Sequence, residues 1–100
     1  MKVTIAGNLE EALADPGATY LAGGTDLMVG INFGRERPEH VISIRGLSEL
    51  REISVGARFR IGGGVTYTRL LESLNGSSPA LVEAARTIGS PQIRNAGTIG

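Results

Sequence analysis

The sequence contains no cysteine and a single histidine, His40, and this excludes several classes of site. A zinc site or an iron–sulfur cluster needs several cysteine or histidine ligands, so we expect no metal site built by this chain. A cysteine nucleophile and a disulfide framework are excluded for the same reason. His40 precedes an apolar run, and we interpret it as a surface or partly hydrogen-bonded side chain rather than as a ligand.

Long apolar runs and an excess of charge of one sign are also lacking. Ten basic residues balance ten acidic ones, so we expect no attraction to nucleic acid or to a membrane surface. No stretch approaches the roughly 20 apolar residues that a membrane span requires, and the first residues do not resemble a signal peptide. We therefore expect a cytoplasmic protein. No pair of carboxylates is placed for acid–base work, so no residue is predicted to be catalytic.

Glycine, by contrast, is abundant, with 15 among 100 residues. The glycines concentrate beside apolar runs in three places: Gly23-Gly24, Gly62-Gly63-Gly64, and Gly97 with Gly100. Glycine in such positions marks tight turns or places where another group approaches the backbone closely.

The first half of the sequence alternates strand and helix signals. Short apolar runs predict three strands, at residues 3–6, 19–22 and 40–44. An N-cap pattern beginning at Asn8 and the helical spacing of apolar residues after Asp26 predict two helices, at residues 9–14 and 27–33. This order predicts a small three-stranded parallel βαβαβ unit, with right-handed crossovers that place the helices on the faces of the sheet.

The pattern changes after residue 51. Alternating apolar residues predict an antiparallel hairpin over residues 52–62 with Gly56-Ala57 in its turn. Thr66 and Pro79 predict the starts of two further helices, and residues 89–100 are expected to be irregular. The fold class predicted is therefore α+β, with a first domain at residues 1–54 and the beginning of a second at residues 55–100.

The strongest local signal is the segment Leu21-Ala22-Gly23-Gly24-Thr25-Asp26-Leu27, in which a strand passes through two glycines directly into a helix. Backbone amides at such a turn have no intrahelical partner, so a pyrophosphate could bind against them, with a hydrogen bond from the Thr25 hydroxyl. The alternative is a structural turn in which Thr25 caps the helix. The segment is neither a Walker P-loop nor the dinucleotide fingerprint.

Two further segments are weaker signals. Gly62-Gly63-Gly64-Val65-Thr66 is better interpreted as a tight turn followed by a Thr66 cap than as a binding loop. In the segment from Gln92 to Gly100, Thr98 and the amides that follow it could hold a phosphate or a ring edge. Arg94 is the arginine of interest, because it lies in this glycine-rich stretch.

Together, in this order, the three segments resemble the FAD-binding subunits of molybdenum hydroxylases, the class that includes xanthine and carbon monoxide dehydrogenases, with their PCMH-type FAD-binding fold. In that family, the first glycine loop and a later Thr-Ile-Gly-Gly-Asn segment together hold the FAD pyrophosphate. The resemblance therefore implies a cofactor site made of Leu21, Ala22, Gly23, Gly24, Thr25, Asp26 and Leu27, with Thr98, Ile99 and Gly100 opening the second loop. Ile88 falls where a side chain of the family comes near the flavin.

The resemblance also implies an oxidoreductase component. The flavin of the family relays electrons from iron–sulfur (2Fe-2S) clusters of a partner subunit to NAD, oxygen or another acceptor, and a further subunit binds the molybdopterin cofactor. The sequence stops before the last Gly-Asn of the second loop, so we expect the isolated 100-residue chain to be inactive. Two alternatives stay open: an interaction module without flavin, and a nucleotide-binding protein of another kind that uses Gly23 and Gly24.

Overall fold

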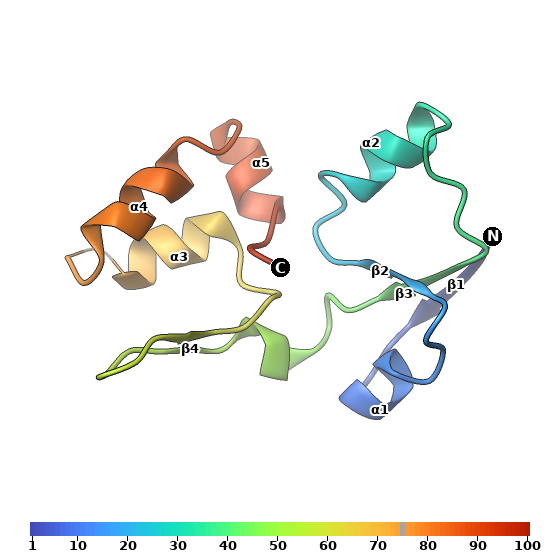
Figure 1. Ribbon diagram of the computed structural model, residues 1–100, viewed down its shortest axis with the longest axis horizontal. Coiled ribbons are helices and arrows are strands. Elements are labelled where there is room, and N and C mark those ends of the chain that lie inside the picture. The colour runs from blue at the N-terminus through green and yellow to red at the C-terminus, as the bar shows by residue number, and fades with distance from the viewer. Residues whose placement is uncertain (75) are drawn as a thin grey trace. The chain divides into compact units, whose positions relative to one another are not determined.

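The computed structural model describes residues 1–74 and 76–100, and the chain forms two compact units, residues 1–48 and 49–100. The first contains β1 (Lys2–Ile5), α1 (Leu9–Ala12), β2 (Thr19–Leu21), α2 (Leu27–Asn32) and β3 (His40–Ser43) (Figure 1). A 3₁₀ helix, η1 (Ser48–Arg51), begins at the division. The second contains β4 (Ile53–Ser54), β5 (Arg60–Ile61), α3 (Tyr67–Leu74), α4 (Pro79–Arg86) and α5 (Pro91–Ala96). Within the described ranges, no helix has the length and apolar character needed to cross a bilayer.

The sheet of the first unit has the strand order β1-β3-β2, and both pairs of neighbours are parallel. The two crossovers run through α1 and α2, which lie on opposite sides of the sheet (Figure 1), as right-handed connections require. The central strand β3 contains the two best buried residues of the sheet, Val41 and Ile42. The predicted βαβαβ unit is confirmed.

Helix α1 is only one turn long, and its start is fixed by side chains. The Glu11 amide donates to Asn8 Oδ1 at 2.8 Å, and the Gly7 amide donates to Glu11 Oε2 at 2.8 Å. These bonds satisfy two amides near the start of the helix, as in a capping box. The helix ends at Ala12, two residues earlier than the sequence predicted.

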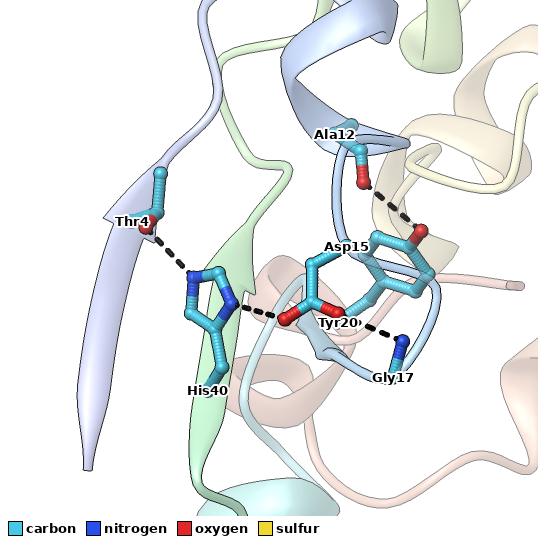
Figure 2. A network of polar contacts seen from close by, with 6 residues as sticks. All are labelled: Thr4, Ala12, Asp15, Gly17, Tyr20 and His40. Carbon is cyan, nitrogen blue, oxygen red and sulfur yellow. Dashed lines mark hydrogen bonds and ion pairs between the residues drawn. The ribbon is translucent and has the colours of Figure 1, made fainter.

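A chain of polar contacts joins three segments of the first unit (Figure 2). His40 Nε2 lies 2.8 Å from Thr4 Oγ1 on β1, and His40 Nδ1 lies 2.7 Å from Asp15 Oδ2 in the turn before β2. The other carboxylate oxygen of Asp15 accepts a hydrogen bond from the Gly17 amide at 3.0 Å. Because alternate residues of a strand share a face and Thr4 is in register with Ile42, Thr4 and His40 lie on the same face of the sheet. His40 is thus a structural residue, as the sequence suggested.

The second unit packs three helices beside an antiparallel hairpin. Strands β4 and β5 pair with Ile53 opposite Ile61. Buried apolar side chains of α3 and α4 form the core with Val65, namely Leu70, Leu74, Val82 and Ala85. The Arg69 amide donates to Thr66 Oγ1 at 3.2 Å, which confirms Thr66 as a helix cap. The predicted α+β fold class is therefore confirmed in both units.

Two details of the second unit differ from the sequence prediction. Residues 91–96 form α5 rather than an irregular loop, with Ser90 Oγ accepting from the Ile93 amide. The hairpin connection spans residues 55–59, longer than the two-residue turn predicted. The two compact units divide between residues 48 and 49. The division into FAD-binding subdomains at residues 1–54 and 55–100 stays a prediction.

Gly62 gives the clearest test of how the second unit packs. A Cβ atom at Gly62 would lie 2.2 Å from the backbone oxygen of Leu50 and 2.4 Å from its carbonyl carbon. Because backbone atoms cannot rotate away, we expect Gly62→Ala to lower the free energy of unfolding by at least about 2 kcal/mol, as overpacked sites do. Gly56→Ala is the control, since its Cβ would meet nothing closer than 4.0 Å. Urea unfolding measures both; equal midpoints for the two variants would contradict the packing described.

The Asp15–His40 contact predicts a pH dependence of stability. The hydrogen bond from His40, followed by that from the Gly17 amide, holds the pKa of Asp15 below its ordinary value of 3.8. A carboxyl group whose pKa is lower in the folded than in the unfolded state stabilises the fold above the unfolded pKa, and that stabilisation is lost as pH falls through the folded pKa. We therefore expect stability to decline below about pH 4, and less steeply in Asp15→Asn and His40→Gln. Thermal melts between pH 2 and pH 6 test this, with Glu10→Gln as a control outside the network. A wild-type slope in Asp15→Asn would refute it.

Candidate functional site

The carboxyl ends of the three parallel strands meet at one edge of the first sheet. Leu21 and Ser43 are in register at this edge, and the Ile44 amide donates to the Leu21 carbonyl at 2.9 Å. The connections that follow β1 and β2 pass to opposite faces of the sheet. This edge therefore contains the topological switch point of the sheet. Open parallel sheets bind ligands at such a point, outside the carboxyl ends of the strands.

The loop that follows β2 presents backbone amides at this edge. Among the described residues, no protein group accepts a hydrogen bond from the amides of Gly23, Gly24, Thr25, Asp26 or Leu27. Gly24 has a φ angle of 76°, in the left-handed region that favours glycine. Consecutive amides around a turn of this kind can together bind an anion. The loop thus has the unbonded amides that an anion site would need, and the anion-binding role stays a prediction.

The side chains of Thr25 and Asp26 do not cap helix α2. Asp26 stands at the N-cap position of α2 with its side chain exposed and without a capping hydrogen bond. Thr25 is half-buried, and no hydrogen bond to its hydroxyl occurs within the described chain. The alternative in which Thr25 caps the helix is not what the structure shows. Helix α2 ends at Asn32, with Phe33 at the C-cap position and Gly34 after it at a φ of 72°.

The second glycine cluster is structural. The Gly62 amide donates to the Glu52 carbonyl at 2.9 Å, the Gly64 amide to the Leu50 carbonyl at 2.7 Å, and the Val65 amide to the Gly62 carbonyl at 3.1 Å. These glycines let one backbone segment lie directly against another. The interpretation of this cluster as a turn followed by the Thr66 cap is supported.

The segment from Thr98 to Gly100 forms a short extended pairing instead of an open loop. Thr98 bridges Thr66 in antiparallel fashion. The Ile99 amide donates to the Val65 carbonyl at 3.1 Å, and the Gly100 amide to the Gly63 carbonyl at 3.0 Å. The expectation that amides after Thr98 are available to a phosphate is therefore wrong for Ile99 and Gly100. The Thr98 amide is the donor in neither of these two hydrogen bonds, so the correction does not extend to Thr98.

Ile88, the remaining predicted site residue, is half-buried in the turn between α4 and α5. The carbonyl groups of this turn accept hydrogen bonds from Arg94 Nη1 on α5. The sequence pointed to Arg94 only through its place in a glycine-rich stretch. Its acceptors lie five to eight residues earlier, a separation that no local motif specifies.

A cavity of about 500 Å³ lies beside η1 and the β4–β5 hairpin, and none of the predicted site residues lines it. It is lined by Glu49, Leu50, Glu52, Ser54, Arg60, Ile61 and Gly62. In the part of the chain that the structure describes, no three His, Cys, Asp or Glu side chains come together as a metal site would require. The loop after β2 is therefore the better candidate, because its amides have chemistry to offer a ligand.

Comparisons with known proteins agree on one family. A family model described as "FAD binding domain in molybdopterin dehydrogenase" matches residues 1–100. The chain is 38% identical over 101 residues to the xanthine dehydrogenase FAD-binding subunit of Escherichia coli O157:H7, covering 97% of this chain and 35% of that protein. It is 45% identical over 83 residues to the nicotinate dehydrogenase FAD-subunit of Eubacterium barkeri, covering 80% of this chain and 28% of that protein.

A solved structure of carbon monoxide dehydrogenase from Hydrogenophaga pseudoflava superposes with a TM-score of 0.90 at 33% identity, over 100% of this chain and 38% of that one. The chain thus spans about a third of the length of the curated relatives it matches.

Proposed function

Because the chain belongs to the family of FAD-binding domains in molybdopterin dehydrogenases, we propose that it binds FAD through the loop that follows β2. The main support is the row of five amides from Gly23 to Leu27, which donate to no protein group in the described chain. The diphosphate of FAD is an anion, and amides around a left-handed turn hold anions without a charged side chain. We propose that the Thr25 hydroxyl adds a further donor.

The flanking residues of the loop fit the same group. Leu21 ends the strand, Ala22 follows it, and Leu27 begins the helix, so these residues flank the turn. The carboxylate of Asp26 would repel a phosphate, but Asp26 is exposed and can turn toward solvent. The proposed first part of the site is therefore Leu21 to Leu27, with the amides as ligands and the side chains as supports.

For the second unit, we propose that Ile88, Thr98, Ile99 and Gly100 also belong to the FAD site. Since the Ile99 and Gly100 amides donate to protein carbonyls, we assign the polar contact to Thr98 and a backbone-shaping role to the other two. A Cβ at Gly100 would lie 2.6 Å from the Gly63 oxygen, so only glycine fits there without a shift. Ile88 is proposed as an apolar neighbour of the flavin.

When bound, FAD supplies reversible electron-carrier chemistry, while the protein supplies its binding and orientation. We propose that this chain belongs to a larger oxidoreductase and holds the cofactor on an electron path. The path would lead from iron–sulfur clusters of a partner subunit to NAD, oxygen or another acceptor. A further partner would hold the molybdenum cofactor at which substrate is oxidised. A location in the cytoplasm is part of the same proposal.

The proposal predicts different effects of two matched alanine substitutions, one on each side of α2. Gly24 and Gly34 both have left-handed backbones, with φ of 76° and 72°, so alanine at either position strains the chain by about 1–2 kcal/mol. A Cβ at Gly24 would also lie 3.2 Å from Met28 Cγ, whereas one at Gly34 meets nothing within 4 Å. Because the strain and the contact with Met28 fall within the proposed anion-binding loop only at Gly24, we expect Gly24→Ala to weaken FAD binding about tenfold or more, and Gly34→Ala to leave it unchanged.

Flavin fluorescence titration of the complete apoprotein measures this, with thermal melts to confirm that the two variants lose similar stability. Equal FAD affinity in the two variants would refute the assignment of the loop. A complete wild-type protein without saturable FAD binding would refute the function itself and favour the interaction module.

A further inference from the structure

We propose that Arg94 is a positioning residue of the FAD site, which holds the turn that contains Ile88. Arg94 Nη1 donates to three backbone carbonyls, those of Arg86 at 3.2 Å, Ile88 at 2.9 Å and Gly89 at 3.3 Å. All three belong to the end of α4 and the turn that follows it. This inference rests on the proposed function, in which Ile88 is a neighbour of the flavin.

The hydrogen-bond geometry singles out Ile88 among the three acceptors. Nη1 has two hydrogens, so three acceptors require that one hydrogen be shared. The bond to the Ile88 carbonyl is the shortest and the only one of the three that is part-buried. A hydrogen bond from a charged donor in a part-buried position is among the stronger kinds in proteins. The backbone conformation of Ile88 therefore depends on Arg94 more than the conformations of Arg86 and Gly89 do.

The turn itself has little other freedom. Gly89 has a φ of 50°, and a Cβ at this position would lie 2.8 Å from Ile93 Cβ. The Arg94 amide donates to the Ser90 carbonyl at 2.9 Å, so backbone and side chain of Arg94 hold both ends of the turn. The turn is thus packed against the first turn of α5, and Arg94 on α5 is hydrogen-bonded to it.

The opposite end of α5 leads directly to Thr98. The Gly97 amide donates to the Ile93 carbonyl at 2.7 Å, and the Gly97 carbonyl accepts from the Tyr67 amide at 3.1 Å. Thr68 Oγ1 donates to Asn95 Oδ1 at 2.6 Å, which ties α5 to α3. Helix α5 is therefore the element that fixes Ile88 and Thr98 relative to one another within the second unit, and Arg94 is its connection to Ile88.

The guanidinium of Arg94 has no carboxylate partner within ion-pair distance in the described chain, where the ion pairs are His40–Asp15 and Arg86–Glu83. Its charge is directed at carbonyl dipoles instead. Lysine at this position keeps a charge and a donor but lacks the planar fork of arginine. A graded effect of Lys and Gln substitutions is therefore expected if positioning is the role of this residue.

The experiment compares Arg94→Gln and Arg94→Lys in the complete protein, with Arg86→Gln as the matched control. The Arg86 side chain is exposed and, among the described residues, bonds only Glu83, and its substitution leaves the Arg86 carbonyl in place. Hydrogen exchange of residues 86–90 is measured in the apoprotein, and FAD affinity and the visible circular dichroism of bound flavin in the holoprotein. For Arg94→Gln we expect faster exchange, FAD binding about tenfold weaker and a changed flavin signal, because the charged donor to these carbonyls is lost. Arg94→Lys should be intermediate, and Arg86→Gln unchanged.

Two outcomes would overturn the inference. If exchange becomes faster in Arg94→Gln while FAD affinity and the flavin signal stay at wild-type values, Arg94 stabilises the fold without positioning the site. If none of the measurements changes, the contacts have no energetic weight. A failure of the proposed function is distinct from both, because Gly24→Ala would then also leave FAD binding unchanged, whereas in these two outcomes Gly24→Ala still weakens it.

Discussion

Strand β3 lies between β1 and β2 and is hydrogen-bonded to each of them in parallel, so the sheet of the first unit depends on it. Its two central residues, Val41 and Ile42, are almost fully buried, one toward each face. The strand begins at His40, which joins Thr4 to Asp15, and ends beside Leu21, where the Ile44 amide holds the last residue of β2. One end of β3 is thus attached to the turn before β2, and the other end fixes where the glycine loop starts.

Glycine serves two different physical purposes in the two units. At Gly24 glycine permits a left-handed backbone, in a loop whose amides donate to no protein acceptor in the described chain. At Gly62 and Gly100 the missing side chain lets backbone pack on backbone, and the nearby amides are already bonded to carbonyls. Glycine-rich segments of similar appearance therefore differ in what they can bind, and the difference lies in the partners of their amides.

The sequence predicted features that depend on nearby residues. The parallel unit followed from the alternation of apolar runs, and the caps at Asn8 and Thr66 followed from residue types at short spacing. Helix α5 was missed although Ser90-Pro91 repeats the start signal of Ser78-Pro79, because too few apolar residues follow it to show a helical period. The pairing that occupies the Ile99 and Gly100 amides, and the carbonyls bound by Arg94, involve partners that only the folded chain brings together. Family resemblance pointed to the loops but could not say which of their amides are free.

The strand order β1-β3-β2 also has a consequence for how the first unit forms during synthesis. When β1 and β2 have left the ribosome, neither has yet met the strand with which it pairs, since β3 follows both in the chain. The sheet can assemble only after residues 40–43 have emerged, and β3 must then insert between two strands that were unpaired until that moment. Contacts between residues far apart in sequence close late and slowly. The backbone N–H and C=O groups with which β1 and β2 pair to β3 therefore stay without these partners for the whole interval in which the glycine loop and α2 are being made.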